Sequence, residues 1–192
     1  PMPSRSLIAL LSVLPKHGMS RVAGWLASRR VPVGWRGAVY RGYARVFGVN
    51  LAEVGAPLAS YESVNAFFTR TLADGVRPIA EAGIVSPVDA AVGAYGRVEA
   101  DTLVQAKGRT YSLRALLGDA ELAARCDGGT YTTLYLSPRD YHRIHAPASG
   151  QVTRATYIPG ALWPVNEAAV QHVDSLFAVN ERIVVALEGA QG

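Results

Sequence analysis

Two of the four histidines in the 192-residue chain, His142 and His145, lie three positions apart and close to a carboxylate, Asp140. Imidazole is the side chain whose ordinary pKa lies nearest to neutrality, so such a group can transfer protons. One buried structural histidine and one surface histidine are the alternative, and the spacing alone favours neither. A zinc site that adds His172 is a third possibility, although zinc needs three or four ligands and the only cysteine is Cys126.

Asp89 is the carboxylate that we expect to meet these histidines in the folded chain. It ends the short apolar segment Ile84–Asp89, which has the composition of a strand. An aspartate at such an end is often only a cap or a turn acceptor. The functional alternative is that Asp89 orients an imidazole and holds its tautomer, as the aspartate of a catalytic triad does.

The residues around the histidines predict a strand, a tight corner and a second extended segment. Residues 130–136 are β-branched and aromatic, which favours a strand. Ser137 has the character of a helix N-cap, with Pro138 at the first helical position, so one short helical turn is expected next. Ala146 precedes a proline and is therefore extended, so that His145 begins the next extended segment.

The remaining pattern predicts an α+β fold, with N-terminal amphipathic helices beside a mostly antiparallel β core that carries short inserted helices. We expect a basic, helical, membrane-facing region over residues 1–75 and a β-rich catalytic core over residues 76–192. Helices are expected over Ser4–Leu14, up to Ser28 after a Ser20 cap, over Trp35–Phe47, Tyr61–Arg70 after a Ser60 cap, Leu113–Leu117 after Ser112, and up to Arg125 after Asp119. Strands are expected over Ile84–Asp89, Ala91–Glu99, Leu103–Ala106, Arg109–Tyr111 with a Lys107-Gly108 turn, Gln151–Ile158 and Arg182–Leu187.

Basic residues are concentrated at the N-terminus. Residues 1–50 contain no acidic side chain, and the first one is Glu53. Arginines interleaved with leucine and tryptophan are typical of helices that lie on an anionic membrane, although a solvated basic face is the commoner meaning of the pattern. Nucleic acid is not expected as a partner, because no stacking module accompanies the charge. The basic residues are Arg5, Lys16, Arg21, Arg29, Arg30, Arg36, Arg41 and Arg45.

Composition excludes several classes of protein. Hydrophobic residues make up 49% of the chain, enough for a packed core. A single cysteine excludes an intrachain disulfide framework and indicates a reducing compartment. The apolar run Leu7–Leu14 is too short to span a bilayer, and no small-residue cleavage site follows it, so we expect it to be retained.

Several separate stretches at compatible spacing resemble the phosphatidylserine decarboxylases, and the resemblance runs through the whole chain in order. They are Phe67-Phe68-Thr69-Arg70-Thr71-Leu72 with Arg77-Pro78-Ile79, Ser86-Pro87-Val88-Asp89 before Gly93, Leu103 to Gly108 before Tyr111-Ser112-Leu113, Tyr135 to Pro147, Tyr157 to Asn166, and Leu176 to Arg182. The resemblance implies an enzyme that converts phosphatidylserine to phosphatidylethanolamine and carbon dioxide at a membrane surface. Its cofactor is a pyruvoyl group that the chain makes from one of its own serines by self-cleavage.

The resemblance also implies roles for individual residues. Asp89 and His145 are similar to the pair that activates the serine for self-cleavage, and His142 to the histidine that serves decarboxylation, as a proton donor. Substrate binding would involve Tyr135, Tyr141, Trp163 and Val165; for Trp163 a plain core role is the alternative.

One departure from the family is large: the 192 residues contain no Gly-Ser dipeptide, so the Leu-Gly-Ser-Thr type of cleavage motif is absent. We therefore expect most of the β chain, truncated before that motif, which needs a pyruvoyl-bearing α chain and is inactive alone. The partners implied are phosphatidylserine, an anionic membrane surface met by residues 1–50, and the α chain, with a homodimer as a further option, on the cytoplasmic face of the cell membrane. A non-catalytic membrane-associated remnant of the fold and, less favoured, a zinc-dependent hydrolase are the alternatives.

Overall fold

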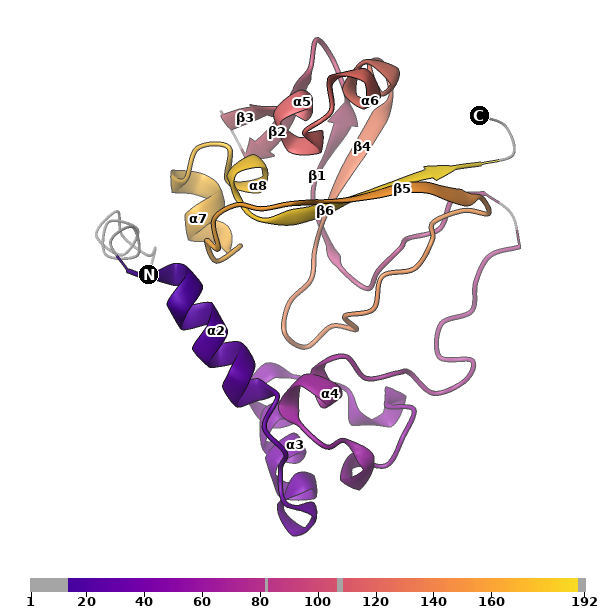
Figure 1. The fold of residues 1–192 in the computed structure, drawn as a ribbon. Coiled ribbons are helices and arrows are strands. Elements are labelled where there is room, and N and C mark those ends of the chain that lie inside the picture. The colour runs from indigo at the N-terminus through magenta and orange to yellow at the C-terminus, as the bar shows by residue number, and fades with distance from the viewer. Residues whose placement is uncertain (1–13, 82, 107–108, 190–192) are drawn as a thin grey trace. The chain divides into compact units, whose positions relative to one another are not determined.

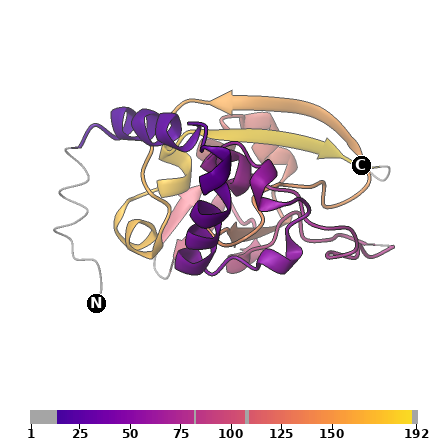
Figure 2. The same ribbon diagram turned by 90° about the horizontal axis from the view of Figure 1, so that it is seen from below.

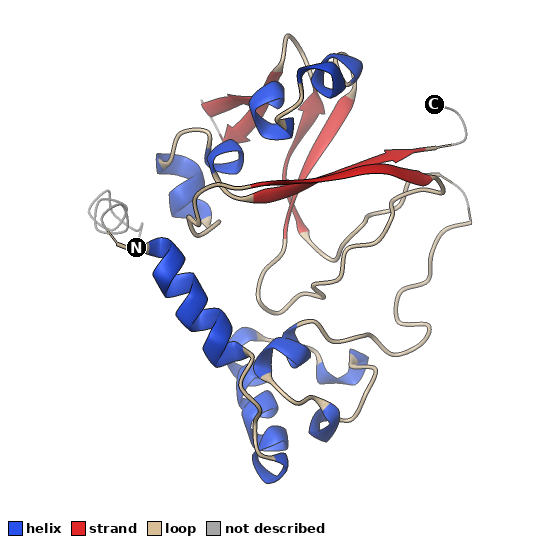
Figure 3. Ribbon diagram, in the orientation of Figure 1, coloured by secondary structure: helices blue, strands red, loops and turns tan. Residues whose placement is uncertain are grey.

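The computed structural model describes residues 14–81, 83–106 and 109–189 (Figure 1). These residues form two compact units, each described by itself. The helical unit comprises residues 21–91 and 134–149, and the sheet unit comprises residues 14–20, 92–133 and 150–189. The described chain is α+β, with helices first and antiparallel strand pairs with short helices afterwards (Figure 3). The functional division at residue 75 stays a prediction.

The helices at the start of the chain differ in their limits from the prediction. Helix α2 (Lys16–Ala27) begins just after Pro15, so Ser20 lies inside the helix and does not cap it. Proline is compatible with a helix start. The N–H groups of the first turn have no carbonyl partner within the helix, so a residue without an N–H group loses no hydrogen bond there. The helix predicted over Ser4–Leu14 lies outside the described residues, except for Leu14.

Helix α3 (Val33–Phe47) begins two residues earlier than predicted and ends at Gly48, whose φ of 80° provides the left-handed C-cap. Two 3-10 turns follow, η1 (Leu51–Glu53) and η2 (Leu58–Ser60). The prediction for the next helix was wrong about its length and its cap, because Ser60 belongs to η2.

Helix α4 (Val64–Phe68) is capped by Ser63, whose hydroxyl accepts a hydrogen bond from the Ala66 N–H at 3.1 Å. The Ser60 hydroxyl instead donates to the carbonyl of Pro57 at 2.7 Å, across the turn η2 to which Ser60 belongs. Sequence alone did not separate two serines with the same propensity, three positions apart.

Aromatic rings form the core of the helical unit. Tyr40 and Phe67 are fully buried and stack with their ring centroids 4.8 Å apart, and Tyr61 meets Phe67 edge-on at 5.4 Å. The Tyr40 hydroxyl donates to the carbonyl of Tyr61 at 2.9 Å, which satisfies the polar end of a buried ring. This core fixes α3 against α4, the helix that leads to the candidate site.

Three antiparallel strand pairs make up the sheet unit (Figures 1 and 2). Strand β1 (Ala91–Arg97) pairs with β4 (Thr130–Tyr135), β2 (Thr102–Ala106) with β3 (Arg109–Ser112), and β5 (Gln151–Ile158) with β6 (Arg182–Glu188). These strands confirm the sequence prediction to within two residues. The predicted Lys107-Gly108 turn lies outside the described residues.

Short helices connect the strands. Helices α5 (Leu113–Leu117) and α6 (Ala120–Arg125) carry the predicted caps, Ser112 and Asp119. Helices α7 (Glu167–His172) and α8 (Leu176–Val179) were not predicted. Gln105 of β2 is buried and bonds to both α7 and α8 or their flanking residues. Its amide nitrogen donates to the carbonyls of Val170 and Val173, and its amide oxygen accepts from the Leu176 N–H.

Candidate active site

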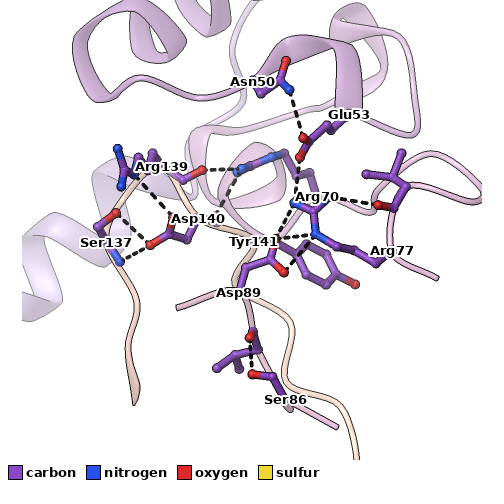
Figure 4. Close-up of polar contacts among 12 residues, drawn as sticks. Asn50, Glu53, Arg70, Arg77, Ser86, Asp89, Ser137, Arg139, Asp140 and Tyr141 are labelled. Atoms are coloured by element: carbon purple, nitrogen blue, oxygen red, sulfur yellow. Dashed lines mark hydrogen bonds and ion pairs between the residues drawn. The ribbon is translucent and has the colours of Figure 1, made fainter. Parts of the chain in front are cut away.

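A tight turn, and not a helical turn, precedes the histidines. The Asp140 N–H donates to the carbonyl of Ser137 at 2.9 Å. The Asp140 carboxylate in turn accepts from the Ser137 N–H at 2.7 Å and from its hydroxyl at 2.8 Å (Figure 4). Residues 138–140 form a turn that does not continue into a helix, so Ser137 has no helix to cap. The prediction of a helix here was therefore wrong, although the corner lies where it was expected.

The segment that carries Asp89 is not a regular strand, contrary to the prediction for Ile84–Asp89. Two backbone hydrogen bonds nevertheless join it to the histidine stretch: Val85 N–H donates to the carbonyl of Pro147, and His145 N–H donates to that of Pro87, both at 2.8 Å. Proline has no N–H group, so the two prolines stop the ladder from growing. This short pairing brings Asp89 alongside His145.

Asp89 and His145 line one cavity of the helical unit, with a volume of about 390 Å³. Arg77, Tyr141 and Ser86 supply the other polar side chains of its lining. The rest of the wall is apolar and comes from Leu72, Pro78, Ile79, Val85, Pro87, Val88 and Ala146. An apolar cavity with a few convergent polar groups is the usual form of a small-molecule site.

The Asp89 carboxylate is held by Arg77 (Figure 4). Arg77 Nε lies 3.0 Å from both carboxylate oxygens, and Nη2 lies 2.6 Å from Oδ2. Nη2 also donates to Glu53 Oε2 at 2.8 Å, and Asn50 donates to the other oxygen of Glu53 at 2.9 Å. Arg77 thus bridges two carboxylates, which raises the pKa of its guanidinium, through Asp89 first and Glu53 second.

His145 is paired with Tyr141 and not with Asp89. The Tyr141 hydroxyl and His145 Nε2 share a hydrogen bond of 3.0 Å, and the two rings stack with centroids 5.5 Å apart. The imidazole is exposed on its other side. The structure therefore brings the predicted acid and base into one cavity without a direct hydrogen bond between them in the part of the chain that it describes.

His142 is half-buried and firmly oriented. Its Nε2 donates to the carbonyl of Ser137 at 3.0 Å, so in the neutral ring the unprotonated nitrogen is Nδ1. The ring of Phe68 packs against the imidazole with centroids 3.9 Å apart. The orientation and tautomer of His142 are thus set by the corner on one side and by α4 on the other.

The residues after α4 hold the histidine stretch in place. Arg70 Nη2 donates to the carbonyls of Arg139 and Asp140, at 2.8 and 3.2 Å. In the opposite direction, Arg143 Nε donates to the carbonyl of Thr69 at 2.8 Å. The Arg70 side chain is only 4% exposed, and burial lowers the pKa of its guanidinium. These bonds fasten both ends of the segment that contains His142.

The four residues assigned to substrate binding lie in different places. Tyr141 lines the cavity, and Tyr135 is exposed at the end of β4. Trp163 belongs to the sheet unit. Its backbone N–H donates to Asn180 Oδ1 at 2.9 Å, and the amino group of Lys16 lies over its half-buried ring, 4.2 Å from the ring centroid. Val165 is exposed nearby in the sequence. Their role in substrate binding stays a prediction.

No group of three or more histidine, cysteine, aspartate or glutamate residues is arranged to hold a metal ion in residues 14–81, 83–106 and 109–189. His172, the third ligand of the zinc alternative, donates from Nδ1 to the carbonyl of Ala168 in its own helix, at 2.9 Å.

Sequence reasoning missed the residues that position the predicted ones: Glu53, Phe68, Arg70 and Arg77. A signal for three of them was present, because Phe68, Arg70 and Arg77 lie within the stretches that carry the family resemblance. Glu53 is the first acidic residue after an acid-free region, which marks it as unusual but does not name its partner.

Acidification is expected to remove the stabilisation that Glu53 provides. The hydrogen bond from Arg77 lowers the pKa of Glu53 below its usual value of 4.5, so this stabilisation is complete above that value and is lost as the pH falls through the lowered one. Glu53→Gln should therefore lower the free energy of unfolding by about 0.5–1 kcal/mol near neutral pH, a modest amount because the pair is partly exposed.

Urea unfolding of the 192-residue chain at neutral and acidic pH measures this effect, and the difference between wild type and Glu53→Gln should shrink in acid. Glu62→Gln is the matched control, since Glu62 pairs with Arg30 on an exposed surface. A Glu53→Gln effect that is equal at both pH values would contradict the assignment.

Comparisons with known proteins decide the family. The sequence model of phosphatidylserine decarboxylase matches residues 64–192. The phosphatidylserine decarboxylase proenzyme of Anaeromyxobacter sp. (strain K) is 52% identical over 193 residues, which cover 100% of this chain and 68% of that protein. The chain belongs to the phosphatidylserine decarboxylase family.

Two further members of the phosphatidylserine decarboxylase family show the same relation in length. The proenzyme of Verminephrobacter eiseniae is 47% identical, with 100% of this chain and 67% of the relative covered. That of Dechloromonas aromatica is 46% identical over 182 residues, with 94% and 64% covered. The chain thus spans about two thirds of the length of these relatives.

Among the helices that the structure describes, none combines the length and the hydropathy that a membrane crossing requires.

Proposed function

We propose that these 192 residues supply the acid–base side chains of a phosphatidylserine decarboxylase, which releases carbon dioxide from phosphatidylserine to give phosphatidylethanolamine. The observation that carries the proposal is the cavity shared by Asp89 and His145. Residues from two distant parts of the sequence meet there, in a chain that belongs to this family. An acid and an imidazole in one cavity can take a proton from a hydroxyl group and hold the charge that results.

In the proposed roles, Asp89 and His145 activate the serine whose self-cleavage produces the pyruvoyl group. His145 takes the hydroxyl proton at one imidazole nitrogen, and Asp89 stabilises the cation that forms. No Gly-Ser dipeptide occurs in residues 1–192, so the serine comes from another part of the protein. The 192 residues alone are therefore inactive as a decarboxylase. A pyruvoyl group fits the cavity in size and surroundings, and when present it supplies the carbonyl that accepts electrons from the substrate.

His142 is proposed to return a proton to the substrate carbon that loses carbon dioxide. Its Nε2–H is bonded to the carbonyl of Ser137, so His142 acts as an acid in its imidazolium form and transfers the proton that this form carries on Nδ1. Phe68 shields one face of the ring, which limits its rotation. A general acid needs such a fixed orientation, because proton transfer requires hydrogen-bond distance to the acceptor.

The pyruvoyl-bearing α chain is proposed to cover one face of the β5–β6 pair in the sheet unit. Paired residues point to the same side of a strand pair, and the side that carries Tyr157, Ile183 and Val185 is more than half exposed. The opposite side is occupied, since Arg182 donates to the carbonyls of Ala115 and Leu116. An apolar face of this kind is typical of an interface. The relatives, which are about half as long again, contain the additional sequence to cover it.

A longer chain tests the proposal. We define the completed chain as residues 1–192 joined to the part of the Anaeromyxobacter relative that lies beyond the aligned residues. It is expected to cut itself into two chains and to release labelled carbon dioxide from phosphatidylserine, whereas residues 1–192 alone release none. The unmodified relative is the positive control. A completed chain that folds but stays uncut, while the control is processed, would overturn the proposal; so would decarboxylation by the 192 residues alone.

Membrane binding through α2 and α3 is also proposed, at the cytoplasmic surface and without a spanning segment. Val22, Trp25 and Leu26 of α2 are each more than half exposed, and the Arg29 guanidinium stacks 3.8 Å from the Trp25 ring. Apolar side chains that enter a bilayer interface stabilise binding by about 1.5–3 kcal/mol each when fully buried. Each arginine near anionic lipid adds about 1 kcal/mol.

Trp25→Ser together with Leu26→Ser is expected to weaken binding to vesicles that contain anionic lipid by at least about tenfold, from the lost apolar area. Co-sedimentation with vesicles measures it, and added salt should weaken the wild type as well. Ile84→Ser is the control, because Ile84 is exposed outside these helices. Equal binding by the double variant and the wild type would favour the alternative of a merely solvated basic face.

A further inference from the structure

We propose that Arg77, itself held by Glu53, is a positioning residue for Asp89 in self-cleavage. The inference rests on the function proposed for Asp89 and extends it to residues to which the family resemblance gave no role. Arg77 acts through the carboxylate and is not proposed to touch the reacting atoms.

All three nitrogens of the Arg77 guanidinium are engaged. Nε and Nη2 face Asp89, Nη2 also reaches Glu53, and Nη1 donates to the carbonyl of Val76 at 3.1 Å. A planar guanidinium with two nitrogens on one carboxylate fixes the plane of that carboxylate as well as its position. Asp89 therefore has one orientation for as long as Arg77 keeps its own (Figure 4).

Backbone hydrogen bonds hold the segment that carries Glu53, the second carboxylate that binds Arg77. The Ala73 N–H donates to the carbonyl of Glu53 at 2.9 Å, and the Gly55 N–H donates to that of Thr71 at 2.9 Å. Gly55 allows this close approach, because a Cβ atom there would lie 2.6 Å from the carbonyl oxygen of Leu72. The pairing ties η1, which bears Glu53, to the segment that leads to Arg77.

The anchoring is stepwise: η1 carries Glu53, Glu53 orients Arg77, and Arg77 orients Asp89. Asp89 belongs to an irregular segment that, among the described residues, is joined to the histidine stretch by two backbone hydrogen bonds. Such a segment does not by itself hold a carboxylate at a defined angle. A positioned carboxylate is what the proposed chemistry needs, since small displacements of a catalytic group cost about 100-fold in rate.

The test compares self-cleavage rates of the completed chain. Arg77→Ala is expected to slow cleavage about 10- to 100-fold. Arg77→Lys keeps the positive charge but not the planar pair of N–H donors, so its cleavage rate should lie between those of Arg77→Ala and wild type. Guanidinium chloride at low millimolar concentration, far below denaturing levels, should restore part of the Arg77→Ala rate but none of the Asp89→Asn rate. Arg97→Ala removes an exposed arginine that bonds to the carbonyl of Gly128 and does not line the cavity, and this variant should cleave at the wild-type rate.

Three outcomes separate this inference from the proposed function. Wild-type cleavage by Arg77→Ala, with Asp89→Asn uncut, overturns the inference alone. A slow Arg77→Ala that neither guanidinium nor lysine improves also overturns it, because a general loss of folding explains that result. Normal cleavage by Asp89→Asn instead refutes the proposed function. If Arg77→Ala does not fold, the Glu53→Gln variant of the completed chain decides instead. It should cleave about threefold to tenfold more slowly than wild type, while its thermal unfolding midpoint stays close to that of wild type. An unchanged cleavage rate overturns the inference.

Discussion

Asp89→Asn in the completed chain is expected to leave the polypeptide uncut, and His145→Ala is expected to do the same. The amide of asparagine has the shape of the carboxylate but no charge to stabilise an imidazolium, and it offers an N–H donor where an acceptor is needed. Loss of this charge in a catalytic triad costs about 10⁴-fold, and loss of a general base about 10²- to 10⁴-fold. A loss of either size slows self-cleavage so far that the variant chains stay uncut while the wild type is processed.

Denaturing gels and intact-mass measurements after fixed incubation times detect the cut. Asp74→Asn is a suitable control, because Asp74 is an exposed aspartate of the same unit that does not line the cavity. The prediction fails if either the Asp89→Asn or the His145→Ala chain is processed at the wild-type rate. In that case the shared cavity has another purpose.

His142→Ala has a different expected signature: self-cleavage proceeds, but turnover of phosphatidylserine falls about 10²- to 10⁴-fold, the amount that a general acid contributes. The reason is that His142 hydrogen-bonds to the corner at Ser137 and packs on Phe68, whereas His145 lies in the cavity with Asp89. Two histidines three residues apart would thus serve two different steps.

A processed His142→Ala chain assayed for carbon dioxide release gives the answer. His172→Ala provides the comparison, since that imidazole bonds within its own helix and its loss should leave turnover intact. Full turnover by His142→Ala, or a failure of this variant to cleave, would remove His142 from the proposed role.

Local signals predicted the strand pairs and several caps from sequence. The β5 and β6 segments are rich in β-branched residues. Ser112 and Asp119 precede short helices that end at or near glycine or a basic residue. Where two residues had the same capping propensity, the sequence did not show which of them caps the helix, as with Ser60 and Ser63 before α4. The segment Ile84–Asp89 has strand composition, but the prolines that flank its pairing leave too few donors for a regular ladder.

The candidate site was predictable as a set of residues but not as a set of contacts. The resemblance named Asp89, His142 and His145, and the structure places two of them in one cavity. Arg77 and Glu53 are 24 positions apart, and their pairing depends on the tertiary fold around η1. Propensity and spacing describe neighbours along the chain, so they do not predict which guanidinium will hold a distant carboxylate.

The two-bond pairing between Val85–Pro87 and His145–Pro147 has a consequence for exchange with solvent. A junction with so few bonds can separate in a local opening, while the aromatic core around Phe67 stays closed. The amide hydrogens of Val85 and His145 should then exchange with deuterium together and much faster than those within α3. Such an opening would give a long-tailed lipid a way in that requires no global unfolding.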